Sequence, residues 1–168
     1  MDYRVVSIVR DHARERGGAP AVSGDGRTVS YADLHERSSR VAQALLAAGL
    51  GRGSRVAYVG ENAPEYFDLL FGAAKIGAVT APVNWRLTPA EIAAVVADAQ
   101  APLTVVDAEF ASLTPGPPGR TVVTGEDFEA WLAAHPADDP GHVGEPGDIV
   151  VQLYTSGTTG VPKGVQLS

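Results

Sequence analysis

The spacing of hydrophobic residues switches repeatedly along the chain between the period of a helix and the short apolar runs of buried strands. Helical spacing occurs in segments that begin at a polar capping residue or end at glycine, which predicts amphipathic helices. Runs rich in valine and threonine lie between these segments and predict strands. The expected strands cover residues 21–23, 27–30, 55–59, 78–83, 103–107, 120–123, 148–154 and 164–168.

Two of the expected helices begin with a capping box. Ser30 is followed three positions later by Asp33, and Thr88 is followed in the same way by Glu91. Each hydroxyl can accept a hydrogen bond from the backbone while the carboxylate bonds back to the capping residue. Pro89 adds a residue type that is favoured at the first helical position. We therefore expect helices to begin directly after Ser30 and Thr88.

Three further helices are expected from weaker signals. The segment 5–16 places four side chains on one helical face, namely Val5, Ile8, Val9 and His12. Asn62, together with Glu65, marks the expected start of a helix that runs to Ile76. Thr124 is expected to cap a short helix whose apolar side chains are Phe128, Trp131 and Leu132.

The order of these elements predicts the fold class. Short strands that alternate with amphipathic helices imply βα units on a mostly parallel sheet. The stretch 135–147 is rich in proline, glycine and acidic residues, which is typical of a solvated linker. We expect residues 1–168 to form a single, incomplete α/β domain with flanking helices, in which the linker 135–147 leads to a loop at residues 154–164.

Composition narrows the possible functions. The 168 residues carry 13 Lys and Arg against 20 Asp and Glu, a net charge of −7, so a nucleic-acid partner is not expected. The absence of cysteine excludes disulfides, thiolate metal sites and a cysteine nucleophile. The most apolar stretch, 66–83, is interrupted by Asp68, Lys75 and Pro82, which argues against a membrane span. With charges throughout its first residues, the chain is expected to be cytoplasmic.

The candidate chemistry lies in a nine-residue segment between the last two expected strands. Residues 155–163 contain three threonines, one serine, two glycines and one lysine. Glycine lets backbone N–H groups approach an anion, hydroxyls donate hydrogen bonds to phosphate oxygens, and lysine adds a positive charge. Such a loop suits a polyphosphate, although loops of this composition are more commonly structural connections between strands. The length beyond the two to five residues that a hairpin turn needs favours anion binding.

Two other phosphate or catalytic motifs are excluded by spacing. A Walker A loop requires Gly-Lys-Ser/Thr followed by a helix, whereas Lys163 is followed by Gly164 and a strand-like run. A hydrolase nucleophile elbow requires glycine two positions before the serine, where this chain has Tyr154. The anion would therefore be held by a loop between strands.

The run YTSGTTGVPKGV at 154–165 resembles the phosphate-loop signature of the adenylate-forming superfamily, which includes acyl- and aryl-CoA synthetases, nonribosomal adenylation domains and luciferases. Twelve residues in that order make a specific match. Further runs resemble other motifs of the superfamily: VSYADL at 29–34, AKIGAVTAPVN at 74–84 and RLTPAEI at 86–92. The Pro-x-Asn-x-Arg-Leu pattern within them is more similar to acyl-CoA synthetases than to nonribosomal domains.

The resemblance implies an AMP-forming carboxylate–CoA ligase (acyl-CoA synthetase) that joins a carboxylic acid to ATP, releases pyrophosphate and passes the acyl group to CoA. By this resemblance, seven matching positions are expected to bind the phosphates of ATP: Thr155, Ser156, Gly157, Thr158, Thr159, Gly160 and Lys163. Thr155 matches the position whose hydroxyl helps to hold Mg²⁺ in relatives. The expected partners are thus a carboxylic acid, ATP and CoA, with Mg²⁺ accompanying ATP.

The chain departs from the family in length. It ends at Ser168 without counterparts of the adenine- and ribose-binding motifs, the glutamate of the Mg²⁺ site or the C-terminal domain with its catalytic lysine. We expect an N-terminal portion that is inactive alone and needs the remainder of the enzyme or a partner chain. Alternatives are another type of adenylation domain or a naturally short, non-catalytic binding module. In a truncated piece, four side chains should be incompletely covered: Val150, Leu153, Val165 and Leu167.

Overall fold

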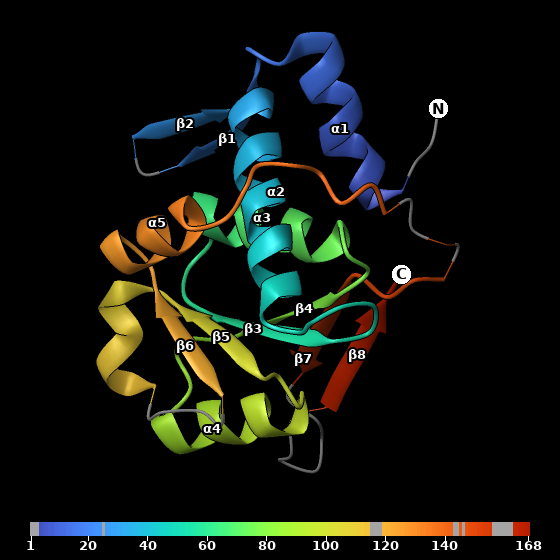
Figure 1. Cartoon of the computed structure of the whole chain (residues 1–168). Coiled ribbons are helices and arrows are strands. Elements are labelled where there is room, and N and C mark those ends of the chain that lie inside the picture. Colours follow the sequence, from blue (N-terminus) through green and yellow to red (C-terminus); the bar gives the residue numbers. More distant parts are fainter. Residues whose placement is uncertain (1–3, 25, 115–118, 143–144, 146, 156–162) are drawn as a thin grey trace.

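The computed structural model describes residues 4–24, 26–114, 119–142, 145, 147–155 and 163–168 (Figure 1). The strands are β1 (Pro20–Gly24), β2 (Arg27–Ser30), β3 (Arg55–Val59), β4 (Val79–Val83), β5 (Leu103–Val106), β6 (Arg120–Val123), β7 (Val151–Thr155) and β8 (Lys163–Leu167). The helices are α1 (Val5–Arg16), α2 (Tyr31–Ala47), α3 (Pro64–Ala74), α4 (Pro89–Asp98), a 3-10 helix η1 (Ala108–Leu113) and α5 (Glu126–Ala133).

Six of the strands form one sheet in the order β6-β5-β3-β4-β7-β8. Every neighbouring pair from β6 to β7 is parallel, and only β8 runs antiparallel, against β7. β1 and β2 make a separate antiparallel hairpin. The predicted α/β fold with a mostly parallel sheet and flanking helices is confirmed.

Helices cover both faces of the central strands, which explains their continuous apolar sequences. One hydrophobic cluster packs α2, α3 and α5 against β3, β5 and β6, with Tyr58 and Phe128 among its large buried side chains. A second cluster packs α4 and η1 against the opposite face, around Ile92 and Phe110. α1 lies against α2 and α3 (Figure 1). The sheet is thus the middle of three layers.

Both predicted capping boxes are confirmed at the starts of α2 and α4. The expected start of α3 is wrong: its N-cap is Ala63, which offers no capping side chain, and Asn62 is exposed. Pro64 sets the first helical position instead. The carboxylate of Glu65 accepts two hydrogen bonds from the guanidinium of Arg27 in β2, at 2.9 and 3.0 Å, and so ties the β1–β2 hairpin to α3.

Two other local expectations are corrected by tertiary contacts. In α1 the fully buried side chains are Val6 and Val9, whereas Ile8 is 40% exposed, because α2 and α3 cover a face rotated from the predicted one. α5 is preceded by Gly125, with φ +93°, rather than capped by Thr124. The hydroxyl of Thr124 instead accepts a hydrogen bond from the backbone N–H of Ala108 at 3.0 Å.

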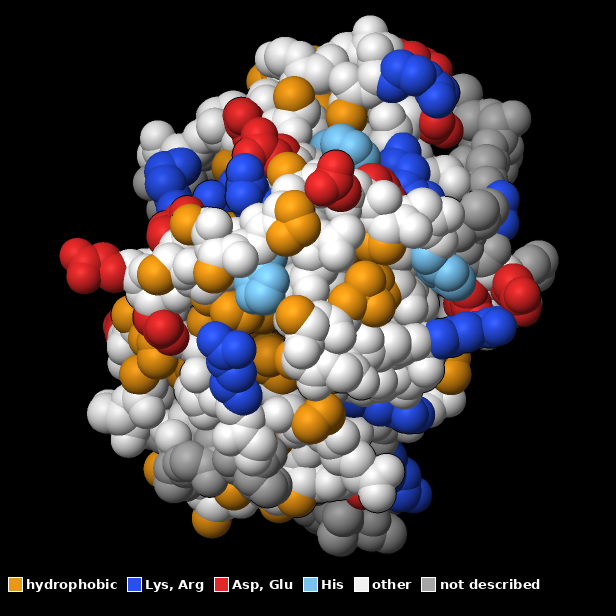
Figure 2. Space-filling view, viewed as in Figure 1, with side chains coloured by type: hydrophobic (Ala, Val, Ile, Leu, Met, Phe, Trp, Pro, Cys, Tyr) orange, Lys and Arg blue, Asp and Glu red, His pale blue; other side chains and the backbone are white. Residues whose placement is uncertain are grey.

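Charged side chains are distributed over the surface. On the face seen in Figure 2, Lys and Arg side chains lie among Asp and Glu side chains. Several arginines are held in ion pairs, including Arg37 with Asp68 at 2.8 Å and Arg52 with Asp148 at 2.7 Å. Among the helices of the described residues, none combines the length and the apolar character that crossing a bilayer requires.

Candidate functional site

The candidate phosphate-binding segment is carried by the β7–β8 hairpin. Thr155 and Lys163 lie opposite each other at the loop end of the hairpin, and both are exposed. β7 is in register with β4 through Thr80 and Val151, so Thr155 lies at the carboxyl end of a parallel strand. In open α/β sheets, ligands bind beyond the carboxyl ends of the strands. The other assigned positions lie outside the described residues: Ser156, Gly157, Thr158, Thr159 and Gly160.

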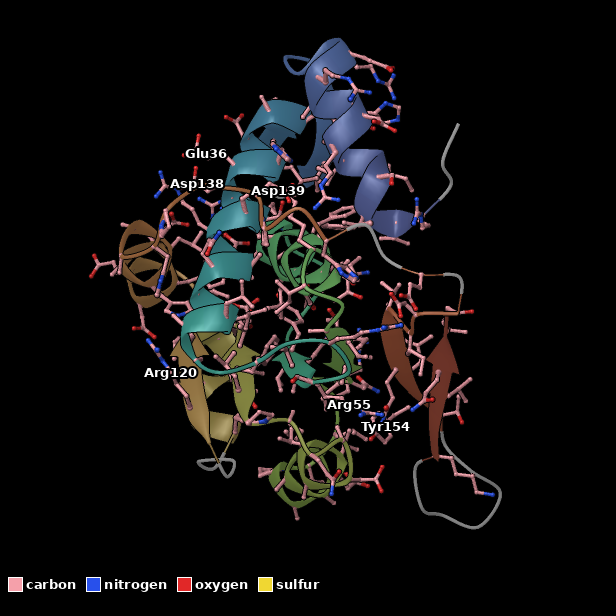
Figure 3. All side chains as sticks on the ribbon, turned by 45° about the vertical axis from the view of Figure 1, so that its right-hand side comes forward. Glu36, Arg55, Arg120, Asp138, Asp139 and Tyr154 are labelled. Atoms are coloured by element: carbon pink, nitrogen blue, oxygen red, sulfur yellow. The ribbon has the colours of Figure 1, made fainter. Side chains whose placement is uncertain are left out.

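A chain of hydrogen bonds anchors this hairpin to α4. The hydroxyl of Tyr154 donates to Oδ2 of Asp98 at 2.7 Å and accepts from Nε2 of Gln152 at 2.8 Å. Burial and the neighbouring Asp98 raise the pKa of Tyr154 to about 12, which keeps the phenol protonated and able to donate. Tyr154 points from the hairpin towards α4 in Figure 3. The strand that leads into the loop is therefore fixed directly before Thr155.

Gln152 extends the same network towards the middle of the sheet. Its side chain is buried, and Oε1 accepts from Nε of Arg55 and from Nε2 of Gln166, both at 3.4 Å. Asp98, Gln152 and Arg55 were not predicted from the sequence as supports of the site. The two-residue spacing of Gln152 and Tyr154 places them on one face of β7 and was the available signal. Their hydrogen-bond partners, Asp98 in α4 and Arg55 in β3, come close to them only in the folded chain.

Gly164 allows the two strands of the hairpin to pack closely. It lies opposite Tyr154, and a Cβ atom at this position would lie 2.8 Å from Nε2 of Gln152. That distance is shorter than any ordinary contact, so a side chain here would displace the amide that bonds Tyr154. The glycine after Lys163 is thus explained by packing in a strand, in agreement with the exclusion of a Walker A loop.

The other face of the hairpin is open. Leu153, Val165 and Leu167 are 40%, 44% and 46% exposed, and Val150 is half-buried. α3 packs against the neighbouring strand β4, whereas these side chains of the hairpin stay exposed. The expectation of incompletely covered apolar side chains on these strands agrees with the structure.

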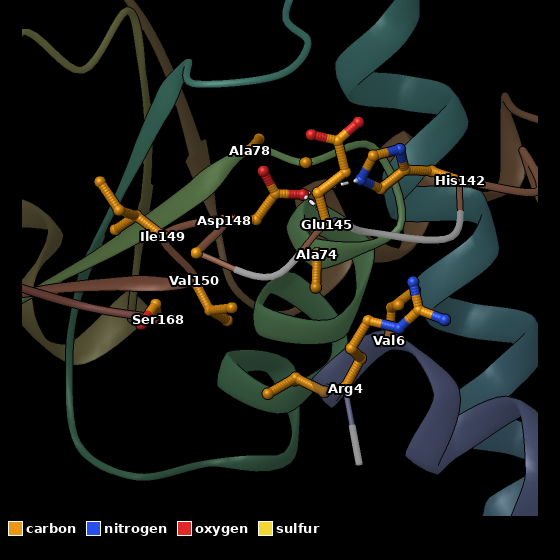
Figure 4. Close-up of a pocket in the computed structure, with 13 residues that line it drawn as sticks. Arg4, Val6, Ala74, Ala78, His142, Glu145, Asp148, Ile149, Val150 and Ser168 are labelled. Carbon is orange, nitrogen blue, oxygen red and sulfur yellow. Dashed lines mark hydrogen bonds and ion pairs between the residues drawn. The ribbon is translucent and has the colours of Figure 1, made fainter. Parts of the chain in front are cut away.

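A cavity of about 700 Å³ lies at the opposite end of the hairpin from Thr155 and Lys163 (Figure 4). Its lining includes Val6 of α1, Ala74 at the end of α3, and Val150 and Ser168 beside the two strands. Because it is remote from the loop end, this cavity is not the phosphate site. Within the described part of the chain, no group of three or more His, Asp or Glu side chains could hold a metal ion.

The chain is similar to known proteins over nearly its whole length. The sequence model of the family described as AMP-binding enzyme matches residues 9–168. The chain is 46% identical over 169 residues to the fatty acid–acyl-carrier-protein ligase ScoC of Streptomyces coeruleorubidus, covering 98% of this chain and 33% of that protein. It is 36% identical over 164 residues to a 3-hydroxybenzoate–CoA ligase of Aromatoleum sp. (strain CIB), covering 89% and 31%.

Solved structures show the same fold. The anthranilate CoA ligase AuaEII in complex with anthranoyl-AMP superposes with a TM-score of 0.90 at 26% identity, over 98% of this chain and 34% of that chain. The N-terminal domain of FACL13 from Mycobacterium tuberculosis gives 0.87 at 29% identity, over 98% and 44%. The chain spans about a third of the length of the curated relatives it matches. The match over residues 9–168 shows that this chain belongs to the AMP-binding enzyme family.

Proposed function

We propose that the β7–β8 hairpin presents a loop that grips the phosphates of ATP in an AMP-forming carboxylate ligase. The observation that carries the proposal is the pairing of Thr155 with Lys163, which brings a hydroxyl and an ammonium group to the two ends of the loop at the carboxyl end of β7. The network through Tyr154 and Asp98 holds that end in place. AuaEII, whose structure is similar to that of this chain, was solved in complex with anthranoyl-AMP. Such an acyl-adenylate is the product of the first proposed step.

In that step a carboxylate oxygen attacks the α-phosphorus of ATP, acyl-AMP forms and pyrophosphate leaves. Lys163 would neutralise charge on the leaving pyrophosphate, and Thr155 would donate a hydrogen bond to it. We assign the same role to the hydroxyl and backbone N–H groups of the intervening positions: Ser156, Gly157, Thr158, Thr159 and Gly160. Mg²⁺ would arrive with ATP, with Thr155 as one ligand and the others supplied from outside the described residues.

In the second step a thiol attacks the acyl carbon and AMP leaves. We propose CoA as the thiol, since the 3-hydroxybenzoate relative is a CoA ligase. ScoC transfers to an acyl-carrier protein instead, which makes a carrier protein the alternative acceptor. An assay with free CoA and with a carrier protein distinguishes the two acceptors. The product is an acyl-CoA thioester in the first case and an acylated carrier protein in the second.

We further propose that this chain needs additional protein to complete the site. The exposed side chains of Leu153, Val165 and Leu167 form an apolar face of the kind that folded proteins cover. The remainder of a longer enzyme is the proposed cover; a separate partner chain, or a non-catalytic role, is the alternative. Without that cover nothing would keep water from acyl-AMP, and we expect no acyl-AMP formation by the chain alone.

A chimera tests the proposal. The 168 residues replace the matching third of ScoC, and carboxylate-dependent exchange of pyrophosphate into ATP is measured. We expect exchange by the chimera, a loss of about 10²–10³-fold for Lys163→Ala and Thr158→Ala, and no exchange by the chain alone. Arg14→Ala removes an equally charged, exposed side chain on α1 and serves as the control. Unchanged pyrophosphate exchange in both loop variants would refute the phosphate-binding role and leave the loop as a structural turn between strands.

A further inference from the structure

Residues 135–142 of the linker 135–147 cross the helical face of the protein after α5 (Figures 1 and 3). Side chains from α2 hold its backbone: Nη1 of Arg40 donates to the carbonyl of His135 at 2.8 Å, and Nε2 of Gln43 donates to that of Asp138 at 2.6 Å. This acidic segment was expected to be solvated. Instead, the side chain of Asp139 is only 20% exposed and faces the helices.

Lys75, directly after α3, is the centre of the contacts with Asp139. Its side chain is fully buried, and its ammonium group donates to Oγ of Ser39 at 2.7 Å and to the carbonyl of His35 at 2.8 Å. Nδ1 of His35 lies 3.0 Å from the same nitrogen. An ammonium has only hydrogens to offer, so Nδ1 must carry a lone pair. His35 is therefore neutral in this arrangement, with its proton on Nε2.

Every element packed around this cluster contributes a charged or titratable group. α1 supplies Arg10, which donates through Nε to Oδ2 of Asp139 at 2.7 Å and through Nη2 to Oδ1. α2 supplies His35, Lys75 follows α3, and the linker supplies Asp139 at 3.6 Å from Nζ of Lys75. The cluster thus brings together two cations, one neutral imidazole and a single carboxylate.

We propose that this cluster is an acid-sensitive latch: while His35 is neutral, Lys75 and Arg10 hold Asp139 and the linker against the helices, and protonation of His35 opens the contact. A proton on Nδ1 removes one of the three acceptors of Lys75 and places a third cation beside one carboxylate. The linker leads directly into β7, so its release loosens β7 against β4. This inference rests on the cluster alone and is independent of the ATP-binding proposal.

The directions of the pKa shifts in the cluster agree with the proposed latch. Burial and the Lys75 ammonium lower the pKa of His35 from 6.5 and outweigh the opposing effect of Asp139, whose Oδ2 lies 3.9 Å from Nδ1. By linkage, the protonated imidazole therefore favours the open state. Burial lowers the pKa of Lys75 to about 8, with Asp139 opposing, and Lys75 stays charged in mild acid. Hydrogen bonds from Arg10 and Gly141 outweigh burial and lower the pKa of Asp139 to about 2. Within the cluster, His35 is the only side chain whose ordinary pKa lies near neutrality, and this environment lowers it.

Amide hydrogen exchange of the 168-residue chain at pH 7.5 and 5.5, corrected for the intrinsic rates, tests the latch. The reporters are the amides of the linker and the N–H of Thr80, which donates to the carbonyl of Val150 at 2.9 Å and so reports the docking of β7. We expect both to lose protection in acid, by up to about tenfold at pH 5.5, because that pH lies about one unit below the ordinary pKa of His35. The amides of β3 should keep theirs.

The variant His35→Gln stays neutral and should show no acid loss. His142→Asn removes a histidine of the linker itself, 3.5 Å from Asp148, and as a control should keep the loss. No acid loss in the wild type, an equal loss in His35→Gln, or its disappearance in His142→Asn overturns the proposal. Should His35→Gln not fold, Asp139→Asn decides: low linker protection at both pH values supports the latch, and a wild-type pH response refutes it.

Discussion

The contact between α2 and α3 depends on the absence of a side chain at Gly72. A Cβ atom built there would lie 2.5 Å from Cγ1 and 2.6 Å from Cβ of Val41, and 2.9 Å from the carbonyl oxygen of Ser38. Two of these three atoms belong to the backbone or to a Cβ and cannot rotate away. Gly72→Ala must therefore push the two helices apart by several tenths of an ångström or more, in a layer that covers the central strands.

The expected destabilisation follows from two opposing effects. Overpacking by one methyl group costs up to about 3 kcal/mol, and this close contact belongs at the upper end. Alanine gains about 1 kcal/mol over glycine inside a helix. The net loss is about 2 kcal/mol in the free energy of unfolding, or about 4–8 °C in Tm for a chain of this size. Urea unfolding followed by circular dichroism measures it.

Gly51→Ala is the matched control, because a Cβ atom at this position would have no neighbouring atom within 4 Å and the φ of Gly51 is not positive. We expect its stability to stay within about 0.5 kcal/mol of wild type. In the background of Val41→Ala, the cost of Gly72→Ala should fall, since Cγ1 is gone. A Gly72→Ala protein as stable as wild type would refute the close helix packing on which this reasoning depends.

Three further predictions concern the linker and the hairpin. Asp139→Asn should lower the free energy of unfolding by about 2 kcal/mol at pH 7, because Arg10 outweighs burial and holds the pKa at about 2. This stability is present above pH 3.8 and lost as the pH falls towards 2, so denaturation curves equal at pH 7 would contradict it. Gly164→Ala should cost about 1 kcal/mol by displacing Gln152, and an unchanged urea midpoint would count against that contact. Leu153 is 40% exposed, and Leu153→Thr should reduce self-association of the chain, measured by sedimentation velocity, without lowering Tm. Undiminished self-association would show that another surface causes it.

Features fixed by neighbours in sequence were predictable. The capping boxes at Ser30 and Thr88 form because each pair of residues is three positions apart, whatever the rest of the chain does. The alternation of strands and helices indicated the parallel sheet, since such connections have few topological solutions. The twelve-residue resemblance at 154–165 indicated the family that residues 9–168 match.

Features fixed by distant contacts were not predictable. Glu65 was expected only as part of a helix start, yet it binds Arg27, 38 positions earlier. The buried face of α1 depends on where α2 and α3 lie, which its own period does not determine. Lys75 counted in the sequence only as a charge that interrupts an apolar stretch. Its role at the linker emerges from four segments that meet in the fold.

The central claim is that the end of the β7–β8 hairpin binds the phosphates of ATP. A titration of the ¹⁵N-labelled chain with ATP and Mg²⁺, followed by NMR, tests it most directly. The account predicts that the amide signals of Thr155, Lys163 and Gly164 shift together and saturate, and that Lys163→Ala abolishes the shifts while Arg14→Ala leaves them unchanged. Shifts gathered instead at the cavity around His142 and Asp148, or equal shifts in Lys163→Ala, would contradict it.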